Sequence, residues 1–263
     1  MLRRGVLALT THFRLPHEGM EAFEVLSRGS AILSKRADLS KSVHVLTCAH
    51  VACPWLYPSY YPHEWLQHVD ESFVRHTLAW REVCSCPIIV AHFLLLVQAK
   101  TGALVWETDL EPHVSVHGLR DLALLELTDT QHADALHAFS LVEPLDVPEH
   151  APLTFLGHTQ PNETQILPQS VAGAFFWCNP STKQAFASSD VVLEQGMCGG
   201  AAVANDGRDV VGLIEGIVPV VEGASPAYKS LENHVAFIPR DELTAFVNGT
   251  HPPADIFVTG LAA

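Results

Sequence analysis

The chain has 263 residues, of which 48% are hydrophobic and 17% are charged, which is enough for a sizeable buried core. Its formal net charge of −14 disfavours direct binding to nucleic acid, because such a surface repels phosphate backbones. No apolar stretch reaches the roughly 18 residues that a membrane-spanning helix needs, so we expect no membrane span.

The N-terminus supports two interpretations. Arg3, Arg4 and Arg14 all precede the first acid, Glu18, which is the charge bias of a mitochondrial transit peptide. Alternatively, residues 5–13 form the first β-strand. The six cysteines occur in a chain of this size without a convincing secretory signal, so we expect reduced thiols. A mitochondrial or other reducing intracellular compartment is therefore favoured over secretion.

Most of the chain consists of short segments rich in Val, Ile, Leu and Phe with turn residues between them, a pattern typical of β-sandwiches and barrels. The predicted strands are 22–26, 30–34, 43–47, 88–98, 103–107, 113–117, 122–127, 153–157, 171–177, 201–204, 210–218 and 234–238. One helix is predicted at 241–247, where Asp241 caps the start and Gly249 ends it.

Residues 53–87 form an unusual stretch that carries three Trp and three Tyr. Within it, Trp65, Val69 and Phe73 recur at every fourth residue, which predicts a helix over 64–80. One interpretation is a satellite core under a long loop. The other is an insertion that docks a protein partner or gates a substrate site.

The turn Gly196-Met197-Cys198-Gly199-Gly200, just before an apolar run, is the most informative motif. Glycines on both sides of Cys198 permit a tight turn, in which the N–H groups of Gly196 and Cys198 can bind a developing oxyanion. The Cys198 thiol is a candidate nucleophile if a base removes its proton, because the thiolate is the reactive form.

Two further motifs supply a base and a carboxylate. His50 follows the apolar segment 43–47 and is the candidate base, at a strand end that faces a cleft. Asp121 opens the apolar segment 122–127 and is the candidate group that holds the His50 imidazole in one tautomer. Each motif alone is common, so the prediction rests on their order and flanking residues.

In that order and flanking sequence the chain resembles the trypsin-like (chymotrypsin-fold) peptidases, and within them the HtrA/DegP-type branch. The matching segments are Arg28–Leu33, Val45–Val51, Asp121–Leu127, Phe155–His158, Gly196–Val203, Val210–Ile214 and Val235–Pro239. The resemblance implies an all-β fold of two packed six-stranded antiparallel β-barrels, with a C-terminal helix and a partly helical insertion. We expect one peptidase domain over 1–250, with barrels at about 5–135 and 150–240, and a tail at 251–263.

The resemblance also implies substrate contacts. Substrate is expected to add as a strand beside 212–216, at Gly212, Leu213 and Ile214. Val192 lies six residues before the nucleophile and is expected near the base of the primary specificity pocket. An apolar residue there suits a neutral or apolar substrate side chain rather than Lys or Arg.

Several features depart from the family pattern. Cys198 replaces the serine nucleophile, as in the picornavirus-type cysteine peptidases that share this fold. Met197 stands where zymogen-activated trypsins carry Asp, so activation by a newly cut N-terminus is not expected. The stretch 53–87 lengthens the chain between the base and the acid. Cys84-Ser85-Cys86 lacks the spacing of a usual zinc pair, and we expect neither a metal nor a cofactor.

Two functions from different classes remain open. The first is a cysteine endopeptidase, in which Cys198 attacks a peptide or protein substrate, His50 transfers the proton and Asp121 orients His50. The second is a catalytically inactive structural subunit of a larger assembly, for example a mitochondrial one, with protein partners bound through the 53–87 insertion. The serine-to-cysteine change and the aromatic insertion motivate the second.

Overall fold

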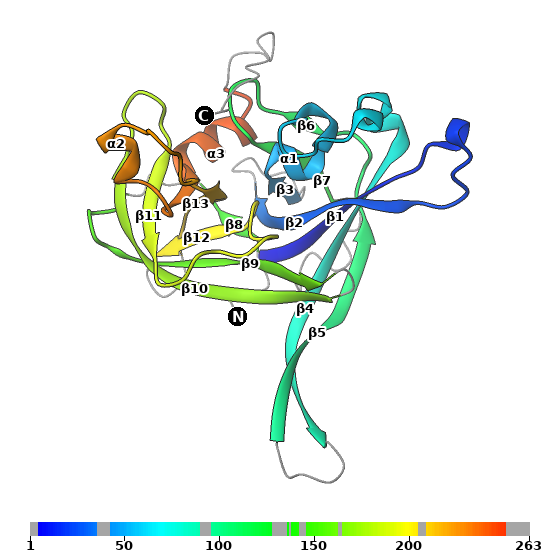
Figure 1. The fold of residues 1–263 in the computed structure, drawn as a ribbon, viewed down its shortest axis with the longest axis horizontal. Helices are drawn as coiled ribbons and strands as arrows, with labels where there is room; N and C mark the ends of the chain where they lie inside the picture. Colours follow the sequence, from blue (N-terminus) through cyan, green and yellow to red (C-terminus); the bar gives the residue numbers. More distant parts are fainter. Residues whose placement is uncertain are drawn as a thin grey trace.

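The computed structural model describes residues 5–35, 43–89, 96–127, 136, 138–141, 146–162, 165–204 and 209–250. Two β-sheets account for most of this part of the chain, with a few short helices beside them (Figure 1). The predicted all-β class is confirmed. The predicted tail at 251–263, the residues Arg3 and Arg4, and the side chains of Cys84 and Cys86 lie outside the described part.

The second sheet along the chain is a closed antiparallel barrel of six strands in the order β10-β11-β14-β13-β12-β9. Its strands are β9 (Pro152–Asn162), β10 (Gln165–Cys178), β11 (Ala185–Ser189), β12 (Ala201–Ala204), β13 (Asp209–Ile217) and β14 (Val235–Pro239). Because strand residues alternate between faces, one set fills the interior, including Phe155, Ile214 and Phe237. One of the two predicted six-stranded barrels is thereby confirmed.

The first sheet has eight strands in the order β5-β4-β1-β2-β3-β7-β6, with β8 parallel to β2. Its strands are β1 (Val6–Phe13), β2 (Glu24–Lys35), β3 (Val43–Thr47), β4 (Val74–Ile89), β5 (Leu96–Asp109), β6 (Ser115–Val116), β7 (Ala123–Glu126) and β8 (Phe139–Ser140). Within the described residues this sheet does not close, so a second barrel is not confirmed. The strand interpretation of residues 5–13 is confirmed, because β1 pairs with both β2 and β4.

A long hairpin of β4 and β5 projects from the rest of the molecule (Figure 1). Of the strand predicted at 88–98, residues 88–89 end β4 and residues 96–98 begin β5, while 90–95 lie outside the described residues. Val, Ile and Leu on both sides of the connection read as one continuous apolar run in the sequence.

The helix predicted over 64–80 is wrong. Short 3₁₀ helices occupy Pro16–Glu18, Pro54–Leu56, Glu64–His68 and Glu71–Phe73, and β4 begins directly after the last of them. A spacing of four residues does not distinguish the two structures, because it returns to the same face of a helix and also of a strand. Val74, His76 and Leu78 are buried, as expected for one face of β4.

The α-helices of the described residues are α1 (Ala49–Ala52), α2 (Pro226–Lys229) and α3 (Arg240–Val247). Helix α3 confirms the predicted C-terminal helix, although it begins one residue earlier and without a side-chain cap. Its Leu243 is buried, and Thr244 Oγ1 donates to the Leu141 carbonyl at 2.8 Å. None of the helices in this part of the chain is long and apolar enough to cross a membrane.

Candidate active site

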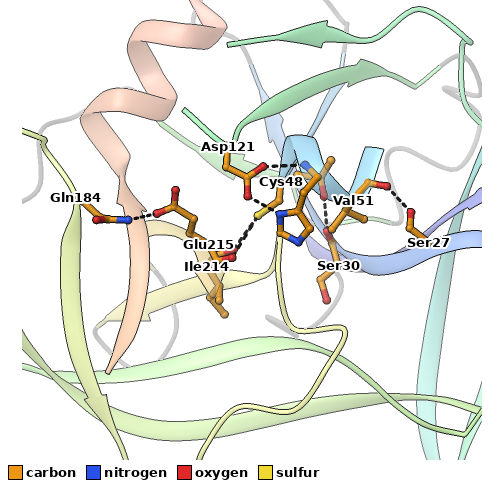
Figure 2. Close-up of polar contacts among 10 residues, drawn as sticks. Ser27, Ser30, Cys48, Val51, Asp121, Gln184, Ile214 and Glu215 are labelled. Carbon is orange, nitrogen blue, oxygen red and sulfur yellow. Dashed lines mark hydrogen bonds and ion pairs between the residues drawn. The ribbon is translucent and has the colours of Figure 1, made fainter. Parts of the chain in front are cut away.

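His50 and Asp121 are brought together by the pairing of two neighbouring strands. Thr47 at the end of β3 pairs with Ala123 at the start of β7, so α1 and the loop before β7 lie side by side. The His50 backbone N–H donates to Asp121 Oδ1 at 2.8 Å, and Asp121 Oδ2 bonds the imidazole Nδ1 (Figure 2). Both side chains are only 10% exposed. The carboxylate therefore fixes the ring orientation and leaves Nε2 for a second partner.

Opposing effects set the pKa of His50. Burial by itself lowers this pKa, because it penalises the charged imidazolium. The charge and hydrogen bond of Asp121, together with a hydrogen bond and charge from Cys198, outweigh burial and raise the pKa to about 10. The imidazole is therefore protonated at neutral pH, between a carboxylate and a thiol.

This shift predicts that His50 stabilises the fold at low pH and that this stability is lost on the alkaline side. A raised pKa contributes fully below the unfolded value of about 6.5 and disappears as the pH rises through about 10. At about 1.4 kcal/mol per pKa unit, the contribution is a few kcal/mol. Asp121→Asn should remove most of it, so the urea unfolding free energies of the two proteins should differ most at pH 6 and converge by pH 10. A constant difference across that range would contradict the assignment.

The turn that carries Cys198 joins β11 to β12. Gly196 and Gly199 adopt φ values of +99° and +85°, which favour glycine. Gly199 N–H donates to the Ile214 carbonyl at 2.8 Å, and Gly200 N–H donates to the Met197 carbonyl at 3.0 Å. Within the part of the chain that the structure describes, the N–H groups of Gly196 and Cys198 donate to no protein acceptor. These two amides are the ones that the sequence predicts as oxyanion donors.

Ser30 of β2 attaches this turn to the first sheet. Its N–H donates to the Cys198 carbonyl at 2.8 Å, and its Oγ donates to the Gly196 carbonyl at 2.8 Å. Oγ also accepts from His158 N–H at 2.8 Å, and the Ser30 carbonyl accepts from Thr47 Oγ1 at 2.7 Å. Sequence reasoning assigned Ser30 no role, because its contacts join residues far apart in the chain, with 166 residues between Ser30 and Gly196 in sequence number.

A second thiol lies beside the imidazole. Cys48 Sγ is fully buried and donates to the Ile214 carbonyl at 3.2 Å, the same carbonyl that accepts from Gly199 (Figure 2). Burial, followed by the nearby acidic groups Asp121, Cys198 and Glu215, raises the pKa of Cys48 well above its ordinary value. The sequence shows Cys48 two residues before His50 but gives no sign that both side chains turn toward the same space.

The beginning of the aromatic insertion covers His50. The Tyr60 ring stacks on the imidazole with centroids 4.9 Å apart, and Tyr57 meets it edge-on at 6.1 Å. Further along, Leu66 and Val69 are buried in a small separate cluster with residues of β1 and β4. The insertion thus contributes both a satellite core and an aromatic wall against the base.

Of the residues predicted to bind substrate, three lie in β13 and Val192 lies at the surface. Gly212 and Leu213 pair with β12 on one side and β14 on the other, so their backbone offers no open edge. Ile214 N–H likewise donates to the Gly200 carbonyl at 2.8 Å. On the side of β13 that faces β12, strand pairing ends at Leu213 and Ile214 bonds Gly200, which leaves 215–217 without a pairing strand on that side among the described residues. Val192 is 61% exposed, which places it at the surface rather than at an enclosed pocket base.

Glu215 is a charged residue at this edge that sequence reasoning missed. Its carboxylate accepts a hydrogen bond from the Gln184 amide of the β11 region (Figure 2). Burial is the largest effect on the pKa of Glu215 and raises it, with the Asp121 carboxylate adding to the rise. The buried acid thus makes the environment of Asp121 and Cys48 more negative.

The residues predicted as catalytic and oxyanion groups therefore lie together where the two sheets meet, whereas Gly212 and Leu213 are paired on both edges and Val192 is exposed. No protein-family model matches the chain, and no curated protein is significantly similar to it.

Proposed function

We propose that the protein is a cysteine endopeptidase with a Cys198–His50–Asp121 triad and a trypsin-like arrangement of two β domains. The first sheet would correspond to the N-terminal barrel and the closed barrel to the C-terminal one. The observation that carries the proposal is the environment of Cys198. Cys198 interacts electrostatically with the imidazole that Asp121 holds, and the N–H groups of Cys198 and Gly196 have no protein acceptor in the described chain.

The raised pKa of His50 keeps the imidazole protonated in the resting site, so an imidazolium stands beside Cys198 as hydrogen-bond donor and proton source. The Cys198 thiolate attacks the substrate carbonyl carbon, and the resulting oxyanion accepts hydrogen bonds from the Gly196 and Cys198 amides. The imidazolium then donates its proton to the leaving amine, which leaves a thioester on Cys198. Neutral His50 next takes a proton from water, and the hydroxide releases the acid product and regenerates the thiolate.

Substrate binding fits the open edge of β13 at 215–217 better than the paired residues before it. An extended peptide that added there as a strand would run beside the aromatic wall formed by Tyr57 and Tyr60. The scissile carbonyl would then face the turn at Cys198. The insertion consequently acts on substrate access, because Tyr60 covers one face of the base.

We expect Cys198→Ala to lower kcat/KM for a cleaved peptide by at least about a thousandfold, because the variant has no nucleophile. The measurement is mass-spectrometric cleavage of a diverse peptide library under reducing conditions. Cys178→Ala is the matched control, since this half-buried cysteine lies at the end of β10, outside the proposed triad. If the unaltered protein and Cys198→Ala cleave the library equally poorly, the endopeptidase proposal fails.

A second candidate function is a structural subunit, and the β4–β5 hairpin favours it. The hairpin projects from the body of the molecule, and β5 is the last strand in the order of the first sheet (Figure 1). A strand in that position presents backbone groups to which a partner strand can pair. In cells, this function predicts that Cys198→Ala leaves both assembly and phenotype intact, whereas the endopeptidase predicts loss of phenotype with assembly retained.

A further inference from the structure

Three side chains of the site form a cluster with the donor chemistry of a metal centre. Cys48 Sγ, a His50 ring nitrogen and an Asp121 oxygen all lie within 4.8 Å of one another. Figure 2 shows the Cys48 sulfur and the Asp121 carboxylate turned toward the same space. Thiolate, imidazole and carboxylate are the ligand types that zinc binds in proteins.

We propose that Cys48, His50 and Asp121 bind Zn²⁺ and that this binding switches the catalytic site off. Metal binding requires only the three side chains, whereas its inhibitory consequence rests on the proposed endopeptidase function. Three protein ligands leave the fourth tetrahedral position to water.

The charge around the cluster favours a cation. Asp121 and Cys48 are members of the cluster, and Glu215 and Cys198 both interact electrostatically with Cys48. Among the described residues, the positive side chains here are His50, which belongs to the cluster, and Arg120, which interacts electrostatically with Glu215. The whole chain carries a formal charge of −14, which also attracts divalent cations toward the protein.

Binding follows a defined proton balance. Zn²⁺ displaces the proton of the Cys48 thiol and the Nδ1 proton of the His50 imidazolium, so two protons leave and the ring remains neutral with its proton on Nε2. Donor atoms around tetrahedral zinc lie about 3.5 Å apart, so the widest separation in the cluster must shorten, whereas Nδ1 and the Asp121 oxygen, which share a hydrogen bond, must move apart. The Nδ1–Asp121 hydrogen bond is replaced by two metal bonds.

Inhibition follows from the same exchange. A metal on Nδ1 leaves the ring neutral with its one proton on Nε2, which is a much weaker acid than imidazolium, so His50 no longer protonates the leaving amine in the proposed mechanism. The aromatic wall and the Ser30 contacts are untouched, so the site loses its reactivity without unfolding.

Cobalt titration of the reduced full chain tests the metal site without any activity measurement. Co²⁺ bound to a thiolate absorbs in the near ultraviolet through charge transfer, and tetrahedral Co²⁺ gives strong visible bands. We expect the unaltered protein to show both and Cys48→Ala to lose the charge-transfer band. Cys198→Ala should keep it, which distinguishes the buried cluster from a metal bound to the catalytic thiol. Cys53→Ala, another buried cysteine that the cluster does not include, should also keep it.

Zinc affinity is then measured by competition with a chromophoric chelator, with circular dichroism as the check on folding. Cys48→Ala should weaken Zn²⁺ binding by at least about tenfold, and Asp121→Asn provides a second variant if Cys48→Ala does not fold. An unchanged affinity in Asp121→Asn, or a charge-transfer band that depends on Cys198 rather than Cys48, overturns the proposal. If the protein binds Zn²⁺ through Cys48 but cleaves no peptide, the metal-site proposal stands and only the endopeptidase proposal fails.

Discussion

Replacing His50 with alanine is expected to slow alkylation of Cys198 by iodoacetamide at pH 6 by at least about tenfold. At that pH an ordinary thiol with a pKa of about 8.5 is less than about 1% ionised, and only the thiolate reacts. In the unaltered protein the imidazolium of His50, whose pKa is about 10, stays charged at pH 6, and in the proposed mechanism this charge activates Cys198. Alanine removes that charge and the hydrogen bond together.

The measurement must resolve individual cysteines, because the chain has six. Peptide mapping by mass spectrometry after timed alkylation gives a separate rate for Cys198. His63→Ala is a suitable control, since this exposed histidine stacks on Trp65 outside the triad. Equal Cys198 rates in the unaltered protein and His50→Ala would show that the thiol is not activated by His50, and would favour the structural subunit.

Gly199→Ala is expected to lower the free energy of unfolding by roughly 3 kcal/mol or more. Gly199 has a φ of +85°, which L side chains rarely adopt, and a Cβ there would overlap the Ser30 carbonyl oxygen and Thr47 Oγ1. Both neighbours are fixed, because Thr47 Oγ1 already donates to the Ser30 carbonyl at 2.7 Å. The turn can accept the methyl group only by moving away from β2, which would break the contacts of Ser30.

Gly216→Ala is the matched control for this prediction. Gly216 lies in β13 near the same site, but a Cβ there meets no atom within 4 Å. Urea unfolding followed by tryptophan fluorescence should therefore show a small change for Gly216→Ala and a large loss for Gly199→Ala. Similar unfolding midpoints for the two variants would mean that the turn is not held against β2 in solution.

The elements that could be predicted from the sequence are those with a local signal. Apolar segments between turn residues predicted most strands of the barrel, and the amphipathic spacing of α3 predicted the C-terminal helix. Local signals failed where a helix and a strand share the same spacing of buried residues, as in the helix predicted over 64–80. They also gave no sign that Gly212 and Leu213 are paired on both sides, because a strand sequence does not reveal which of its edges is already paired.

The sequence by itself determined the chemistry that is available: a thiol in a glycine turn, a histidine after one strand and an aspartate before another. Only the tertiary structure decided which groups meet. It held the Cys198 turn against Ser30, turned Cys48 toward His50 and Asp121, and stacked Tyr60 over the base. These contacts join residues far apart in the chain, and their strength depends on burial, which no local pattern encodes. The raised pKa of His50, on which the proposed reactivity depends, is a product of that packing.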